Sequence, residues 1–271
     1  MALFHTTLQA AGAVTAAVAN RVDLGDITLP AGNWTITRAW AHGTLAGAVT
    51  AVEGLMGYIQ LESVDCGIAP FQFFIEPING PLGTGDYGPQ ATPRKNIVNC
   101  PAAGGSVINV YHVCDQTIST TVSEILVTLE FSNNSPFGGG QIHMKCGEPA
   151  GAGSTTDGGV TSLTDIEIKA STIHAVITYA ALVTPTTATG VILQFEMKSD
   201  DFGENGVHKW GLNTIRAGAA TNSTAQGTET QLQEVGVNFR SGGAKQTVSA
   251  ELTSYDAIAV APVVNWCLVY S

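Results

Sequence analysis

Two nine-residue segments with strict alternation of apolar side chains close the two halves of this 271-residue chain. "EILVTLEFS" ends at Ser132 and "VVNWCLVYS" ends at Ser271, so the copies lie 139 residues apart. Large apolar residues at every second position are typical of a strand with one buried face. They are Ile125, Val127, Leu129 and Phe131 in the first copy, and Val264, Trp266, Leu268 and Tyr270 in the second. The chain is therefore expected to contain two related β domains.

Other segments repeat with small gaps. "DITL" at 26–29 returns as "DIEI" at 165–168, "YIQLES" at 58–63 resembles "ILQFEM" at 192–197, and "NWTITRAW" at 33–40 resembles "STIHAVIT" at 171–178 more loosely. In the second pair, Ile59 and Leu61 are expected to point to one face of the strand, with Gln60 and Glu62 pointing to the other. Each half also contains a long turn-rich loop at the same relative place, at 79–93 and 216–230. Shared strands with divergent loops indicate duplication followed by loop specialisation.

The spacing of strands and turns predicts an all-β protein made of two β-sandwiches. The expected division is 1–132 for the first sandwich with its N-terminal extension, 133–159 for a Gly-rich linker, and 160–271 for the second sandwich. The segment at 8–20 is Ala-rich, but its glycine and β-branched residues favour an extended strand over a helix. The predicted strands lie near 22–29, 33–42, 55–64, 69–78, 95–100, 106–113, 123–131, 163–169, 172–182, 188–198, 207–215, 231–239, 245–252 and 262–270.

The charge of the chain argues against direct contact with nucleic acid. Charged residues make up 12 % of the chain, against about 25 % in soluble domains, which suits a surface covered by copies of itself. The net charge is −11, and Arg21 is the single basic residue among the first 37. Packaging nucleic acid directly requires phosphate-neutralising Lys and Arg, so no direct nucleic-acid contact is expected. The N-terminus does not resemble a secretory signal, and no apolar stretch is long enough for a membrane span.

The five cysteines form no C-x-x-C pair, so a zinc or redox motif is not expected. They are Cys66, Cys100, Cys114, Cys146 and Cys267. We expect small buried hydrophobic residues, with a Cys100–Cys114 bridge as the open alternative.

No catalytic or cofactor motif emerges from the sequence. No two of the six histidines are closer than 31 residues, which excludes the His-x-His pair of a cupin metal site. There is no G-x-S-x-G elbow and no phosphate loop. His143 and Cys146 do not fill a coordination sphere. We therefore expect no enzyme, and no catalytic, cofactor or metal residues. Asp200, Asp201 and Glu204 lie in a turn that either binds calcium or is simply solvated.

Trp34, Ile36, Arg38 and Trp40 are expected to share one face of a strand. Exposed tryptophans there would suit a sugar-binding platform, whereas a core or a subunit interface would bury them. We expect burial, with Arg38 at the rim or in an ion pair.

Taken together, the duplicated strands, the Gly-rich connection and the two equivalent loops resemble the double jelly-roll major capsid proteins of icosahedral bacterial and archaeal viruses with an internal membrane. The residues that carry this resemblance are the "DITL"/"DIEI" and "VTLEFS"/"WCLVYS" pairs and the loops at 79–93 and 216–230, so it covers about 22–271. The chain is short for that family, and repeats visible in sequence are uncommon there.

The resemblance implies two tandem jelly-rolls and a self-assembling structural protein. Three copies would form a homotrimer with a six-lobed outline, which tiles an icosahedral shell in the virion. The two loops would face outward. Penton or minor capsid proteins and an internal membrane would be neighbours. The alternatives are a non-viral surface-layer or tube-forming subunit and a carbohydrate-binding β-sandwich protein.

Overall fold

The computed structural model describes most of the chain, and the statements below refer to these residues. They are 3–12, 21–46, 57–75, 94–113, 122–133, 139–148, 151–169, 171–182, 190–200, 207–212, 215–216, 231–240, 245–255 and 261–271. No helix among them is long and apolar enough to cross a membrane.

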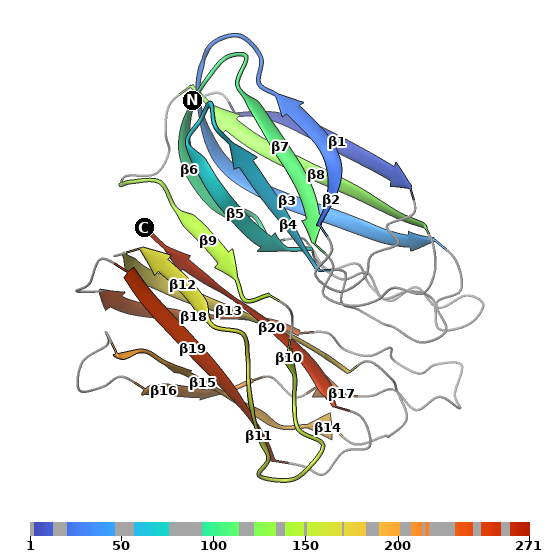
Figure 1. The fold of residues 1–271 in the computed structure, drawn as a ribbon. Coiled ribbons are helices and arrows are strands. Elements are labelled where there is room, and N and C mark those ends of the chain that lie inside the picture. Colours follow the sequence, from blue (N-terminus) through green and yellow to red (C-terminus); the bar gives the residue numbers. More distant parts are fainter. Residues whose placement is uncertain are drawn as a thin grey trace.

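The first half forms two four-stranded antiparallel sheets that pack face to face (Figure 1). Lettered B to I in chain order, its strands give the sheet orders B-I-D-G (β1-β8-β3-β6) and C-H-E-F (β2-β7-β4-β5). This interleaving is that of a jelly-roll. The strands are β1 Leu3–Gly12, β2 Arg21–Thr28, β3 Asn33–Ala46, β4 Tyr58–Ser63, β5 Ile68–Phe74, β6 Asn96–Ala103, β7 Val107–Val113 and β8 Val122–Ser132.

The second half repeats the same order once two broken strands are joined. Strand B consists of β9 and β10, which both pair with β20, and strand C consists of β11 and β12, which both pair with β19. The sheets then read B-I-D-G and C-H-E-F again, so the chain is a double jelly-roll, as predicted. The strands are β9 His143–Cys146, β10 Gly151–Ala152, β11 Val160–Ser162, β12 Ile166–Lys169, β13 Thr172–Leu182, β14 Gly190–Val191, β15 Leu193–Lys198, β16 Val207–Gly211, β17 Ile215–Arg216, β18 Gln231–Arg240, β19 Lys245–Ser254 and β20 Pro262–Tyr270.

The repeated segments occupy equivalent strands. The closing pair forms strand I in both halves (β8 and β20), and its alternating apolar residues face the two cores. "DITL" and "DIEI" lie in strand C, where Ile27 and Ile166 are buried. "YIQLES" and "ILQFEM" form strand E, and the looser pair forms strand D. Each predicted strand segment overlaps an observed strand. β1 confirms the extended conformation at 8–12, whereas 13–20 lie outside the described residues.

The segment predicted as a linker is in part a strand. Residues 143–146 and 151–152 pair with β20 and complete the second BIDG sheet, so they are not a free connection. The strand was not predicted because the high glycine content of the segment indicated a linker. The alternation of His143, Met144, Lys145 and Cys146 is too short to indicate a strand by itself.

A β-bulge in β3 overturns the expected face of the first tryptophans. The pairing with β8 shifts between Ile36 and Arg38, which moves the following side chains to the opposite face. Trp34 and Ile36 therefore contact the core, whereas Arg38 and Trp40 lie on the outer face. Strand D of the second half carries its bulge at the equivalent place, between Ile173 and Ala175.

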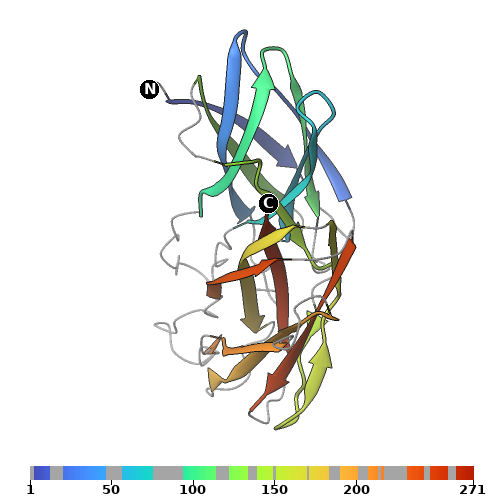
Figure 2. The same cartoon turned by 90° about the vertical axis from the view of Figure 1, so that its left-hand side faces the viewer.

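The two sandwiches lie one above the other in Figure 1, and the turned view in Figure 2 shows the elongated stack. Their contact is apolar and continuous with the first core. Met144, Cys146, Ile177, Tyr179 and Cys267 belong to the second BIDG sheet, yet they pack in the same cluster as the first sandwich's core.

Candidate assembly surfaces

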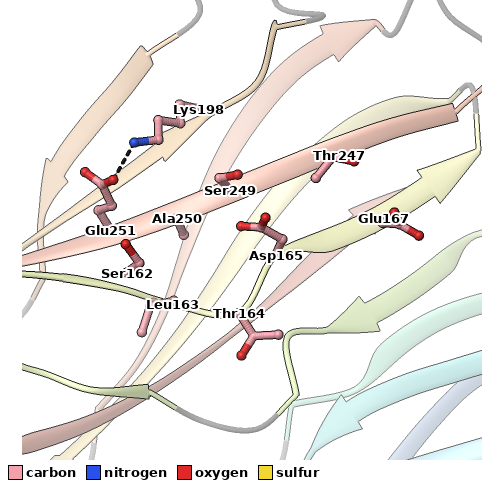
Figure 3. A pocket seen from close by; sticks show the side chains of 10 residues that line it. All are labelled: Ser162, Leu163, Thr164, Asp165, Glu167, Lys198, Thr247, Ser249, Ala250 and Glu251. Atoms are coloured by element: carbon pink, nitrogen blue, oxygen red, sulfur yellow. Dashed lines mark hydrogen bonds and ion pairs between the residues drawn. The ribbon is translucent and has the colours of Figure 1, made fainter.

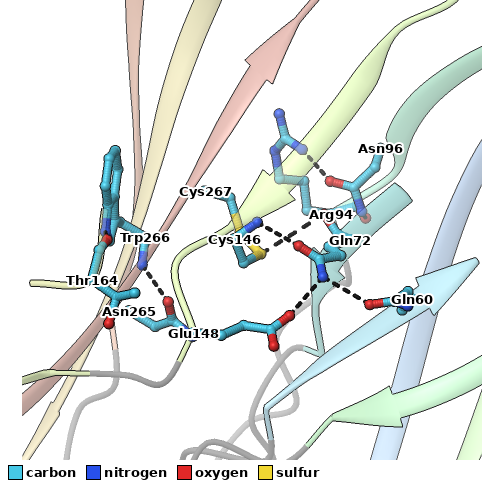
Figure 4. The surroundings of a disulfide bond; sticks show 10 residues. All are labelled: Gln60, Gln72, Arg94, Asn96, Cys146, Glu148, Thr164, Asn265, Trp266 and Cys267. Atoms are coloured by element: carbon cyan, nitrogen blue, oxygen red, sulfur yellow. Dashed lines mark hydrogen bonds between the residues drawn. A yellow bond between two sulfur atoms is a disulfide. The ribbon is translucent and has the colours of Figure 1, made fainter. Parts of the chain in front are cut away.

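The junction between the sandwiches is centred on Gln72 in β5. Its Nε2 donates to Glu148 Oε1 at 2.7 Å, and its Oε1 accepts from the Cys146 backbone N–H at 2.8 Å (Figure 4). Gln72 is 4 % exposed, so a polar side chain is buried here with both ends of its amide satisfied. These bonds fix the position of β5 against β9.

Aromatic contacts flank this amide. Phe74 stacks on Tyr179 with ring centroids 5.5 Å apart, and both side chains are buried. At the rim, Arg94 pairs with Glu234 at 2.9 Å. Such an arrangement of a buried apolar centre and a charged edge is typical of protein interfaces.

A ladder of polar side chains crosses the outer face of the first CHEF sheet and ends at the junction. Arg21 on β2 lies over the Tyr111 ring of β7 at 3.5 Å and forms two hydrogen bonds to Glu62 on β4. Gln60 donates to Glu62 at 2.6 Å and accepts from Gln72 at 2.8 Å. The ladder links all four strands, in their order in the sheet, to the second sandwich.

A disulfide joins Cys146 to Cys267 at the junction (Figure 4). The two residues are directly opposite on β9 and β20, which brings them within reach of each other. The expectation of unpaired buried cysteines is thus wrong for this pair. Cys100 is a buried thiol with no bridge to a described cysteine, and the alternative of a Cys100–Cys114 bridge involves Cys114, which lies outside the described residues. Burial raises the pKa of Cys100 to about 12.

The outer face of the first BIDG sheet contains a buried carboxylate. Glu130 on β8 is 3 % exposed; it accepts from the Thr37 hydroxyl at 2.7 Å and from Arg38 at 3.0 Å, and His5 lies 3.5 Å away. Burial alone would raise the pKa of Glu130, but the bond from Thr37 and the charge of Arg38 outweigh it and lower the pKa. A charged network is therefore built into a face that no described strand covers.

Apolar groups are exposed around this network. Leu126 is 36 % exposed and Ile97 is 39 % exposed on the same face. Trp40 is nearly buried, with the Lys95 ammonium 4.8 Å from its ring centroid. An apolar patch around a satisfied ion pair is a common composition for a contact with another protein.

The outer face of the second CHEF sheet is hollowed and charged. A pocket of about 590 Å³ lies where strand C breaks between β11 and β12, and Asp165, Glu167, Lys198 and Glu251 contribute to its lining (Figure 3). Lys198 pairs with Glu251, and Glu167 pairs with Lys245. Because ion pairs neutralise most of these groups, the pocket does not present a carboxylate cluster to a metal ion.

The remaining sequence-based candidates for a metal site do not come together in the described part of the chain. No group of three or more His, Cys, Asp or Glu residues there could hold a metal ion. His143 stacks on Tyr270, and the Cys146 sulfur is used in the disulfide. Asp200 is exposed, whereas Asp201, Glu204 and the loops at 79–93 and 217–230 lie outside the described residues.

Tryptophan exposure does not favour a sugar-binding platform. Trp40 and Trp266 are buried, and Trp34 and Trp210 are half-buried against the cores. Sequence reasoning missed Gln72 and Glu130. In both strands, the alternation of apolar residues predicts that these positions face solvent. The alternation cannot reveal that the second sandwich covers Gln72 or that an ion pair buries Glu130.

No protein-family model and no curated protein sequence matches the chain. Among solved structures, the chain is similar to the STIV MCP, a major capsid protein, with 9 % identity and a TM-score of 0.46, over 100 % of this chain and 97 % of that chain. The atomic structure of Sulfolobus turreted icosahedral virus gives 11 % identity and a TM-score of 0.45, over 99 % and 90 %.

A tandem CBM22 domain from Paenibacillus barcinonensis Xyn10C gives 9 % identity and a TM-score of 0.24, over 93 % and 82 % of the two chains. At these values the likenesses carry no argument about function. The double jelly-roll assignment rests on the strand orders of the chain itself.

Proposed function

We propose that this chain is the repeating subunit of a virus shell, a major capsid protein that assembles as a homotrimer with a six-lobed outline. The observation that carries the proposal is the packing of its two jelly-rolls. The CHEF sheet of the first covers the outer face of the BIDG sheet of the second, so Tyr179, Asn265 and Cys267 are at most 2 % exposed. This contact joins two different surfaces of related domains, which is a heterologous interface.

The same two kinds of surface remain uncovered by described residues at the two ends of the stacked sandwiches. On the first BIDG sheet, Leu126 occupies the position of Asn265 in the repeat, yet it is exposed. On the second CHEF side, Val207, Ile192 and Tyr255 are 49 %, 53 % and 47 % exposed. Repeating the internal contact between copies would cover both surfaces. A heterologous contact that closes after three copies gives a ring of six sandwiches.

The two alternatives differ in their support. A surface-layer or tube subunit would use the same contact without closing the ring. A carbohydrate-binding protein would use exposed tryptophans, and none of the four is exposed. The low share of charged residues favours a surface that copies of the chain cover. Penton or minor capsid proteins and an internal membrane are further partners of this proposal, with a location in the virion shell.

The test is the solution mass of the purified protein by light scattering, together with negative-stain electron microscopy. We expect particles of about 84 kDa, three times 28.0 kDa, with six lobes, or closed shells built from them. Open sheets or tubes would move the proposal to a non-capsid lattice. A protein that stays monomeric at every concentration would contradict both assembly proposals.

Leu126→Lys tests which surface is used. A charge in the centre of a packed contact costs several kcal/mol when it is left unpaired, so this variant should remain monomeric and keep the circular dichroism of the wild type. Val64→Lys is the control, because Val64 is 99 % exposed in the turn between β4 and β5, away from either surface. Trimers of Leu126→Lys would exclude the first BIDG face from the contact.

A further inference from the structure

A second pocket, of about 400 Å³, lies where the two sandwiches meet. Six residues carry its chemistry: Ala69 and Pro70 of β5, His143 and Lys145 of β9, Lys169 of β12, and Tyr270 of β20. β5 begins at this pocket. None of the contacts at the junction fills it.

The lining is divided into an aromatic side and a cationic side. The His143 ring stacks on Tyr270 with centroids 5.4 Å apart. Lys145 donates to the Glu167 backbone carbonyl at 2.8 Å, and its charge, like that of Lys245, lowers the pKa of Glu167. Lys169 forms no ion pair within the described residues. Glu167 is the only acidic side chain of the lining, and Lys245 pairs with it at 2.7 Å. Positive charge thus accumulates locally in a chain of net charge −11.

The polar groups around the lysines can donate hydrogen bonds. Burial and the charge of Lys169 lower the pKa of His143, and burial raises the pKa of Tyr270. At neutral pH both rings are uncharged, and the Tyr270 hydroxyl and one imidazole N–H are donors. The Thr172 amide donates to the Ser271 backbone oxygen at 3.0 Å.

We propose that this pocket binds a phosphate ester, with its phosphate between Lys145 and Lys169 and its carbon group against Pro70 and Tyr270. Lysines act as point charges toward phosphate oxygens, and hydroxyl and imidazole donors complete the shell. The volume exceeds that of a bare phosphate, and Ala69, Pro70 and Ile168 provide an apolar floor for an attached group. A phospholipid headgroup and a free phosphate ester share this chemistry.

The experiment titrates the full-length protein with glycerol 3-phosphate by calorimetry, and compares wild type with Lys169→Gln. Because Lys169 forms no ion pair with any described residue, its removal orphans no charge among them, and the variant should fold. Lys209→Gln removes the same charge from β16, away from the pocket, although it also breaks the ion pair between Lys209 and Glu196. We expect about a tenfold loss of affinity in Lys169→Gln, none in Lys209→Gln, and a shift of the His143 imidazole resonance on binding to the wild type only.

A vesicle arm separates the two sources. Co-sedimentation with phosphatidylglycerol vesicles, but not with phosphatidylcholine vesicles, that is lost in Lys169→Gln would identify the headgroup. Binding of glycerol 3-phosphate without vesicle binding would identify the free ester. No binding to wild type, or equal binding to Lys169→Gln, would overturn the site. The particle mass of each variant is measured in parallel, so failure of the pocket is distinguished from failure of assembly.

Discussion

At the residue scale, Glu130 links local chemistry to stability. Its carboxylate is nearly fully buried yet charged, because Thr37 and Arg38 replace the water it has lost. Its pKa is lower in the folded protein than the ordinary 4.5. A group with a depressed folded pKa stabilises the protein above its unfolded pKa, and this contribution is lost as the pH falls through the folded value.

Glu130→Gln should therefore reduce the free energy of unfolding most at neutral pH, by about 1–3 kcal/mol. The difference from wild type should shrink below pH 4.5, because the wild-type carboxyl becomes neutral there too. Denaturant unfolding between pH 7 and pH 3 measures this. Glu167→Gln is the control, since Glu167 is exposed and its ion pair with Lys245 is solvated; it should change stability little at any pH. A Glu130→Gln curve parallel to wild type would show that the network contributes no pH dependence.

At the element scale, strand identity could be predicted from the sequence wherever alternation was regular. The four apolar positions of β8 and of β20 face the cores as predicted, because a period of two leaves one choice of face once a core exists. The bulge after Ile36 could not be predicted in this way. It inserts one residue against β8, and nothing in "NWTITRAW" differs from a regular strand.

The broken strand β9–β10 was missed for a different reason. Four alternating residues between glycine-rich segments are too few for a periodicity signal, and pairing with β20, more than 100 residues later, defines the strand. The junction residues Gln72 and Tyr179 were likewise beyond sequence reasoning, because their burial depends on how two finished sandwiches pack.

The Cys146–Cys267 disulfide, which joins the short strand β9 to β20, gives a prediction about the stability of the protein. It spans 121 residues of sequence, and a crosslink over a long loop typically stabilises by about 2–4 kcal/mol. Cys146→Ser with Cys267→Ser should lower the free energy of unfolding by that amount, and reductant should have no further effect on this variant.

Cys66→Ser is the matched control, since Cys66 is a free thiol; its stability should still fall when reductant is added. Intact mass after alkylation without reductant reports the bond directly. Five alkylated thiols in the unfolded wild type would show that the bond does not form.

At the scale of the whole molecule, the two jelly-rolls share one apolar cluster, and the proposed trimer takes their internal contact as the pattern for contacts between copies. The chain already contains one BIDG face covered by a neighbouring CHEF sheet, with a buried amide, an aromatic stack and a disulfide. The proposed assembly would use this kind of contact a second time, between the first BIDG face of one copy and the second CHEF face of another.

The boundary between the halves can be tested with fragments. The structure starts the second jelly-roll at β9, whereas the glycine content indicates a linker there. A fragment of residues 139–271 contains all eight strands of the second jelly-roll, whereas a fragment of residues 154–271 lacks β9 and β10. Without them β20 becomes an edge strand that pairs only with β13, and Cys267 loses its partner. The longer fragment should show β-sheet circular dichroism and a cooperative unfolding transition. The shorter one should aggregate or remain largely unfolded.

Adding reductant to the longer fragment provides a control, because it tests whether the disulfide or the strand pairing stabilises the fold. With reductant present, the longer fragment loses the disulfide but keeps the hydrogen bonds between β9 and β20, so it should unfold earlier while staying cooperative. Equal folding of both fragments would mean that residues 139–153 act as a connection, as their glycine content suggests. Cooperative folding of the longer fragment alone would place the start of the second sandwich before His143.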